Sequence, residues 1–172
     1  ALREACREAV KWPNDIKVAV NVSSVQFQGD GLSKFVVLAL AASGLEAHRL
    51  ELEITESIFL ESSEATLGLL HGLRKLGVRI ALDDFGSGMS SFTYLQTLPV
   101  DYLKIDGSFV KDVVNNSIAE AIVGSINSIA QEMGIQTIAE FVASEAILAK
   151  IRDLGVNYAQ GYSIDKPSQL IL

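Results

Sequence analysis

Six short apolar runs alternate with helix-length segments along the 172-residue chain, and this alternation limits the fold more than any other feature. The runs predicted to be strands cover residues 16–22, 50–55, 78–83, 102–105, 136–141 and 158–162. The segments predicted to be helices cover residues 32–42, 64–76, 90–98, 117–133 and 145–154, and an amphipathic helix opens the chain. Strands that alternate with helices indicate βαβ units and a parallel sheet.

A polar or charged side chain stands near the carboxyl end of every predicted strand. In chain order these residues are Asn21, Glu53, Asp83, Lys104, Glu140 and Gln160. In a parallel barrel all strands end on the face that holds the active site, whereas in an open doubly wound sheet they converge only near a switch point. The pattern therefore favours an α/β fold of the TIM-barrel type. Neither a G-x-G-x-x-G fingerprint nor a P-loop supports a nucleotide-binding open sheet.

The alternation of side chains along a strand makes a second prediction. Residues two and four positions before each polar residue should face the same side of the sheet. This places Lys17, Glu51 and Arg79 in one charged layer at the bottom of the barrel, where we expect them to pair.

Asp83 and Asp84 are adjacent carboxylates at the end of an apolar run, directly before a glycine-containing loop. Burying two neighbouring charges costs several kcal/mol unless a cation neutralises them. A metal site needs such a pair and a fold does not. The alternative is a helix cap or an Asx-turn at the junction of strand and loop.

The strand ends supply hard oxygen ligands and almost no histidine. The candidates are Asn21, Glu53, Asp83, Asp84 and Glu140. This ligand set selects Mg²⁺ or Mn²⁺ over Zn²⁺, and several carboxylates at one barrel mouth can hold two ions about 3.5–4 Å apart for phosphoryl displacement. Lys104 adds a cation that can orient water or neutralise developing charge, and it can also form a salt bridge with a strand-end carboxylate.

Composition narrows the classes of partner. The net charge of −7 argues against a protein that binds the backbone of DNA or RNA, while a small anionic ligand held through metal ions remains compatible. Cys6 is the only cysteine, which excludes a disulfide framework and suits a reducing cytoplasm. No apolar run reaches the roughly 20 residues that span a bilayer.

The strand-end motifs, taken in order, resemble the EAL-domain cyclic-di-GMP phosphodiesterases. They are Asn-Val-Ser at 21–23, Glu-Ile-Thr-Glu at 53–56, Leu-Asp-Asp-Phe-Gly at 82–86, Leu-Lys-Ile-Asp at 103–106, Ala-Glu at 139–140 and Gln-Gly-Tyr at 160–162. The resemblance implies a modified TIM barrel that uses Mg²⁺ or Mn²⁺ to cut one phosphodiester of cyclic di-GMP, which gives linear 5′-pGpG.

The resemblance also implies a role for each motif residue. The metal ligands would be Asn21, Glu53, Asp83 and Asp84. Lys104 would contact the attacking water or an oxygen near the metal, and Glu140 would be a metal ligand or the general base. Gln160 would position a water or the substrate phosphate.

The loop after Asp84 has a further implied role. Glu56 would anchor this loop, which begins with Phe85, Gly86 and Ser87 and runs to residue 94. The loop and the helix after it would reach both the site and the partner in a homodimer, and its glycines fit a mobile gate.

Two departures from the family pattern matter. The Glu-Ala-Leu strand that names the family, and carries one metal ligand, is not in this sequence. We therefore expect residues 1–172 to be a single EAL-type barrel fragment that lacks the first strand and is inactive by itself. Where the family often reads Glu-Gly-Val-Glu, this chain reads Glu140-Phe141-Val142-Ala143.

The parent protein is expected to be cytoplasmic, or the cytoplasmic part of a membrane-anchored protein, with sensory or GGDEF-type domains upstream. Two alternatives to the enzyme stay open. One is a catalytically inactive EAL-like domain that senses cyclic di-GMP or mediates protein interactions. The other is an unrelated Mg²⁺-dependent TIM-barrel enzyme, against which the joint spacing of Lys104, Glu140 and Gln160 argues.

Overall fold

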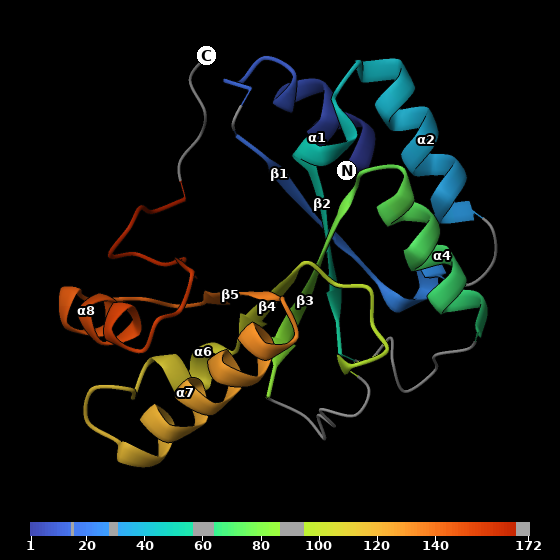
Figure 1. Ribbon diagram of the computed structural model, residues 1–172. Coiled ribbons are helices and arrows are strands. Elements are labelled where there is room, and N and C mark those ends of the chain that lie inside the picture. The colour runs from blue at the N-terminus through green and yellow to red at the C-terminus, as the bar shows by residue number, and fades with distance from the viewer. Residues whose placement is uncertain (15, 28–30, 57–63, 87–94, 168–172) are drawn as a thin grey trace. The chain divides into compact units, whose positions relative to one another are not determined.

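Six strands alternate with helices in the protein, as the computed structural model shows (Figure 1). The structure describes residues 1–14, 16–27, 31–56, 64–86 and 95–167. The chain divides into two compact units, one made of Ala1–Asp83 with Ser91–Asp101 and the other of Asp84–Ser90 with Tyr102–Leu172. Within the described ranges, no helix is both long and apolar enough to cross a membrane.

The first unit is built on parallel strands in the order β1-β2-β3. Its elements are α1 (Leu2–Ala9), β1 (Val18–Val22), α2 (Gly31–Ser43), β2 (Leu50–Thr55), α4 (Glu64–Lys75) and β3 (Arg79–Phe85), with short 3-10 helices at Ser24–Phe27 and Ala47–Arg49. The last two residues of β3 belong to the second unit. Helices α2 and α4 lie side by side in this unit (Figure 1).

The two faces of this three-stranded sheet differ in character. In β1 the valines at 18, 20 and 22 are buried while Ala19 and Asn21 are exposed, so the helices cover the valine face. The parallel register pairs Asn21 with Glu53 and Thr55 with Asp83. Because side chains alternate along a strand, Asn21, Glu53 and Asp83 all lie on the opposite face of the sheet.

Arg79 pairs with a residue that the sequence prediction did not include. The register places Glu51 beside Arg79, as predicted, but the guanidinium of Arg79 contacts Oδ1 of Asp101 at 2.9 Å. Arg74 contacts the same oxygen at 2.9 Å, and Oδ2 of Asp101 accepts a hydrogen bond from the amide of Ile80. Arg79 therefore has a partner that the prediction did not include, and the nearly buried Asp101 satisfies two cations at once.

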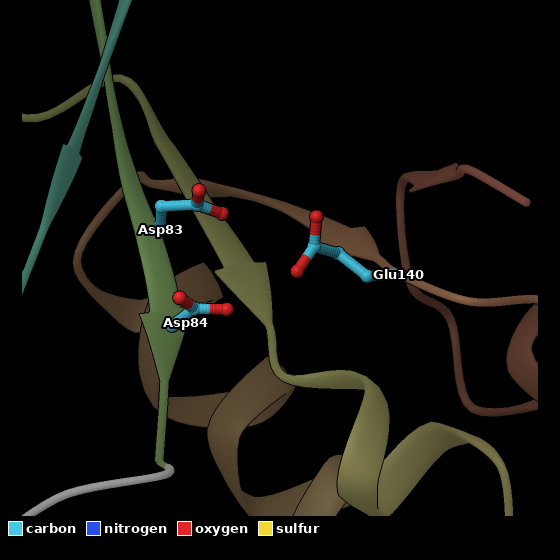
Figure 2. Close-up of side chains that lie close together, drawn as sticks. All are labelled: Asp83, Asp84 and Glu140. Carbon is cyan, nitrogen blue, oxygen red and sulfur yellow. The ribbon is translucent and has the colours of Figure 1, made fainter. Parts of the chain in front are cut away.

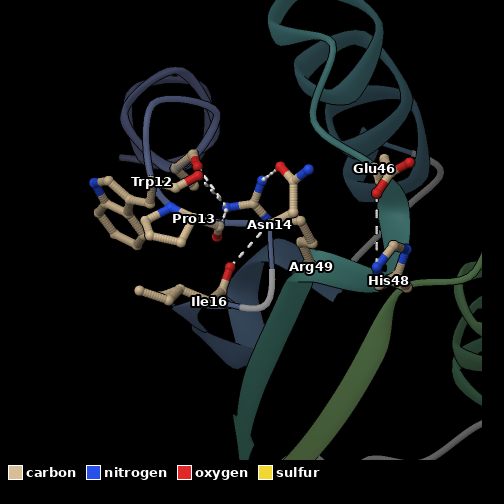
Figure 3. A network of polar contacts seen from close by, with 8 residues as sticks. Trp12, Pro13, Asn14, Ile16, Glu46, His48 and Arg49 are labelled. Carbon is tan, nitrogen blue, oxygen red and sulfur yellow. Dashed lines mark hydrogen bonds and ion pairs between the residues drawn. The ribbon is translucent and has the colours of Figure 1, made fainter.

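The buried Arg49 fixes the segment between α1 and β1 (Figure 3). Its guanidinium donates to the carbonyl oxygens of Ala9 at 2.7 Å, Pro13 at 3.0 Å and Ile16 at 2.9 Å. The last carbonyls of a helix have no partner inside the helix, and Ala9 is the final residue of α1. The side chain of Arg49 therefore closes the end of α1 and holds the turn that follows it.

Replacing Arg49 with alanine should lower the free energy of unfolding by about 3 kcal/mol, because several buried carbonyls lose a charged donor together. Arg49→Lys should recover less than half of this loss, since an ammonium cannot present the same planar fork of donors. Urea unfolding followed by circular dichroism measures both values. The exposed Arg3→Ala serves as the matched control and should stay within about 0.5 kcal/mol of the wild type. An Arg49→Ala midpoint equal to that of the control would contradict the prediction.

The second unit contains parallel strands in the order β4-β5-β6. Its elements are β4 (Tyr102–Ile105), α6 (Gly107–Val110), α7 (Ser117–Glu132), β5 (Gln136–Ala139), α8 (Glu145–Asp153) and β6 (Tyr158–Ala159). Side-chain oxygens cap three of the helix starts: Asp106 accepts from Ser108, Asn116 from Ile118 and Ser144 from Ile147. Helix α6 lies beside α7, and α7 packs against β4 and β5 (Figure 1).

The predicted elements are largely confirmed, with three shortened strands. The strands at 50–55 and 102–105 have the predicted bounds, whereas β1 begins only at Val18. At their carboxyl ends, β5 stops at Ala139 and β6 at Ala159. The cause lies in the backbone: Phe141 has a φ of 54° and Gly161 a φ of 154°, and neither value continues a strand. Of the helix predicted at 90–98, residues 90–94 lie outside the described ranges.

Candidate active site

Lys104 and Glu140 form a buried ion pair at the carboxyl ends of β4 and β5. The two strands are neighbours in the parallel register, and the amide of Glu140 donates to the carbonyl of Ile105. Nζ of Lys104 lies 2.9 Å from Oε1 of Glu140, and the side chains are only 4% and 10% exposed. Removing two charges from water is expensive, so a site that keeps both holds a preorganised cation and anion at a fixed separation.

Asp84 places a second carboxylate beside this pair. One carboxylate oxygen of Asp84 and one of Glu140 lie within 4.8 Å of each other, and Figure 2 shows the two side chains pointing towards one another. Asp84 has a φ of 56°, a left-handed conformation that is uncommon outside glycine and tolerated best by Asn and Asp. Backbone strain of this kind concentrates at functional sites.

Asp83 directly precedes Asp84 in the sequence, and both lie on β3, as Figure 2 shows. One carboxylate oxygen of Asp83 lies within 4.8 Å of one of Asp84. Asp83 is half-buried and Asp84 is exposed. In the first unit, Asp83 shares its sheet face with Asn21 and Glu53, which are direct partners in the register of β1 and β2. The structure therefore supports the predicted grouping of these three residues on one face.

These donors fit a hard divalent cation. Carboxylate oxygens are the ligands that Mg²⁺ and Mn²⁺ prefer, and close carboxylates repel one another unless a positive charge neutralises them. Lys104 supplies one such charge to Glu140. Asp84, exposed and within 4.8 Å of Glu140, is placed to share a cation with it.

Gln160 lies just after β6, at the edge of a pocket of about 600 Å³ in the second unit. The backbone amide of Gln160 donates to the carbonyl of Ala139 at 2.8 Å, and its backbone carbonyl accepts from the amide of Val142 at 3.0 Å. Glu140 also lines this pocket. The predicted site residues Glu140 and Gln160 are thus brought together in one cavity.

Sequence reasoning missed the other polar and aromatic residues of this pocket. These residues, to which the sequence assigned no role, are Lys111, Phe141, Tyr162, Asp165 and Lys166. Tyr162 belongs to a recognised motif, but the two lysines follow no strand end and carry no spacing signal. The substitution of Phe141 for the glycine common in the family was the one available sign.

The predicted loop residues are only partly described. Phe85 is buried at the end of β3, and its carbonyl accepts from the amide of Asp106. Gly86 follows with a φ of 99°, and an added Cβ would lie 2.9 Å from the ring of Phe109. Glu56 lies directly after β2. Ser87 and the rest of the loop to residue 94 lie outside the described residues.

Acidic residues at the ends of parallel strands, in an α/β chain, define a candidate metal-dependent active site of the barrel type. The family model of the EAL domain matches residues 1–167. The chain therefore belongs to the EAL domain family.

The chain is similar to several characterised relatives. It is 38% identical over 175 residues to the cyclic di-GMP phosphodiesterase PdeB of Shewanella oneidensis, a match that covers 98% of the chain and 20% of PdeB. The EAL domain of Mycobacterium smegmatis DcpA is 38% identical with a TM-score of 0.92, and the match covers 96% of this chain and 76% of that one. The PaMucR phosphodiesterase in complex with c-di-GMP is 38% identical with a TM-score of 0.91, and coverage is 96% and 69%.

The fold prediction is confirmed by these matches, because the six parallel strands and their helices superpose on solved EAL domains. The chain spans about a fifth of the length of the curated relatives it matches most strongly, which are longer proteins.

Proposed function

We propose that this chain provides the catalytic part of a cyclic-di-GMP phosphodiesterase that forms linear 5′-pGpG with two Mg²⁺ or Mn²⁺ ions. The observation that carries the proposal is the buried pair of Lys104 and Glu140 with the carboxylate of Asp84 close by. A binding module has no need of a desolvated cation and anion beside an exposed acid. The similarity to PdeB and PaMucR supports the same reaction class.

Within this proposal each residue of the chain has a defined task. Asn21, Glu53, Asp83 and Asp84 would hold the ions, which when bound would supply positive charge for the phosphodiester and a more acidic water. Glu140 accepts a proton from the attacking water while the oxygen of that water bonds to phosphorus. The bond from phosphorus to the 3′ oxygen breaks, and that oxygen leaves as a hydroxyl after it takes up a proton from solvent water.

Lys104 stabilises negative charge in the site, and Gln160 positions the substrate phosphate or the water. The ammonium of Lys104, 2.9 Å from Glu140, keeps that carboxylate oriented and offsets negative charge that develops at the phosphoryl group. Gln160 lines the pocket next to Glu140 and can donate its side-chain amide to a phosphate oxygen or to the water. Glu56 is assigned to anchor the loop that begins with Phe85, Gly86 and Ser87, and this loop is assigned to reach the site.

The setting of the domain is part of the same proposal. Residues 1–172 form one EAL-type domain in a longer cytoplasmic signalling protein, with sensory or GGDEF-type domains elsewhere in the chain. The length of the relatives supports this view. A homodimer through the loop and helix after Asp84 completes the proposal.

Incubation of the full-length protein with cyclic di-GMP and Mn²⁺ tests the reaction, and chromatography identifies the product. We expect 5′-pGpG, and chelation of the metal should abolish its formation. Micromolar binding without product would instead support the sensor, and the absence of both binding and product would overturn the enzyme and the sensor alike.

A further inference from the structure

Phe141 adopts a backbone conformation that is uncommon for a bulky residue. It directly follows Glu140 and has a φ of 54°, where glycine is the usual occupant. Hydrogen bonds fix the chain on both sides: before Phe141 the amide of Glu140 donates to the carbonyl of Ile105 at 3.3 Å, and after it the amide of Val142 donates to the carbonyl of Gln160 at 3.0 Å. The structure around it therefore holds Phe141 in place despite the strain.

The ring of Phe141 is also fixed, although 56% of the residue is exposed. The ammonium of Lys111 lies 4.3 Å from the centre of the ring, within the range of a cation–π interaction. The ring packs so closely on Gly107 that a Cβ added there would lie 2.7 Å from Cγ of Phe141. Lys111 and Gly107 thus orient an aromatic surface that remains open to solvent.

This open ring lines the pocket of about 600 Å³ that also contains Glu140 and Gln160. Tyr162 provides a second aromatic ring in the pocket, 66% exposed, with the ammonium of Lys166 5.7 Å from its centre. Exposed aromatic rings accept planar bases by stacking. The ammonium groups of Lys111 and Lys166 can each contact a phosphate, and the carboxylates of Glu140 and Asp165, which also line the pocket, can accept hydrogen bonds from a base. A nucleotide satisfies both requirements, since it joins a flat base to a phosphate.

We propose that Phe141 is a substrate-binding residue that stacks on one guanine base of the substrate in the pocket that also contains Glu140. This inference rests on the proposed function for the identity of the base. A rigid ring loses little conformational entropy when the ligand binds, because its position is set beforehand. The strained backbone is then explained: it places an aromatic side chain where glycine would place none.

The test compares three chains: the wild type, Phe141→Gly and Phe141→Tyr. Calorimetry with guanosine 5′-monophosphate should show Kd raised about 5- to 150-fold by Phe141→Gly, the range that base–aromatic stacking implies, and nearly unchanged by Phe141→Tyr. Ribose 5-phosphate, which carries the phosphate without the base, should bind wild type and Phe141→Gly alike. The unfolding temperature of Phe141→Gly should equal or exceed that of the wild type, because glycine relieves the strain.

Gly107→Ala adds an independent check. Its new Cβ should displace the ring and raise Kd for guanosine 5′-monophosphate in the wild type, yet have no further effect in the Phe141→Gly background. With cyclic di-GMP, Phe141→Gly should raise KM and leave kcat within about twofold, as expected for a contact made equally in the ground and transition states.

Equal affinity of wild type and Phe141→Gly for guanosine 5′-monophosphate, or no affinity in either, would overturn the inference. Phe141-dependent binding without any turnover or binding of cyclic di-GMP by the wild type would overturn the proposed function alone. The two ideas can therefore fail separately.

Discussion

In the full-length protein, Asp84→Asn should lower kcat for cyclic-di-GMP hydrolysis by about 1,000-fold or more, and Asp83→Asn should do the same. An amide has the shape of a carboxylate but carries no charge, so it binds a divalent cation far more weakly. One oxygen of Asp84 lies within 4.8 Å of one of Glu140. Loss of the aspartate charge should therefore weaken the binding of the cation that is proposed to lie beside Asp84 and Glu140.

Metal binding provides a readout beside turnover. Calorimetric titration with Mn²⁺ should show at least one ion lost, or bound about 100-fold more weakly, in each variant. The unfolding free energy should rise or stay constant without metal, because one of several close negative charges is removed. Retained turnover in either variant would refute its assignment as a metal ligand.

Asp153→Asn is the matched control for this experiment. Asp153 is an exposed aspartate at the end of α8, so the same chemical change occurs on the surface. We expect its kcat, Mn²⁺ affinity and stability to equal those of the wild type within error. A comparable loss of activity in this control would show that net charge, and not the site, controls the reaction.

The order of elements was predictable because periodicity of apolar residues is a local property. The strands at β2 and β4 follow directly from their apolar runs. The ends of β5 and β6 were not predictable in the same way, because the turn at Phe141 depends on contacts some twenty residues away. The amide of Val142 donates to the carbonyl of Gln160, and the carbonyl of Val142 accepts from the amide of Ser163. Long-range contacts of this kind leave no periodic signal.

The partners of charged residues show the same limit. Lys104 and Glu140 could be placed together because parallel neighbours bring both strand ends to one edge. The ion pair of Arg79 with Asp101 could not, because Asp101 lies before β4 and outside any strand pattern. Lys111 reaches the pocket through its contact with Phe141, which no rule of spacing predicts.

Lys104→Met should lower the free energy of unfolding by about 3–5 kcal/mol, the cost of breaking a buried ion pair from one side. The side chain of Glu140 is only 10% exposed and would lose the ammonium that lies 2.9 Å away. The double variant Lys104→Met, Glu140→Leu should recover most of that loss, because apolar side chains of similar volume often replace a buried pair at no cost.

In Lys104→Met and in the double variant, the loss of turnover should not follow the loss of stability. Both variants should lose about 1,000-fold or more in kcat, although the double variant folds nearly as stably as the wild type. Lys150→Met is the matched control: it breaks the half-exposed pair of Lys150 with Glu120, also at 2.9 Å, and should cost less than about 1 kcal/mol with kcat unchanged. Urea unfolding and product formation measured on the same samples decide the outcome. A double variant as unstable as Lys104→Met would show that the pair is not energetically coupled. An active double variant would show that neither residue takes part in the proposed reaction, because the buried charges would then stabilise only the fold.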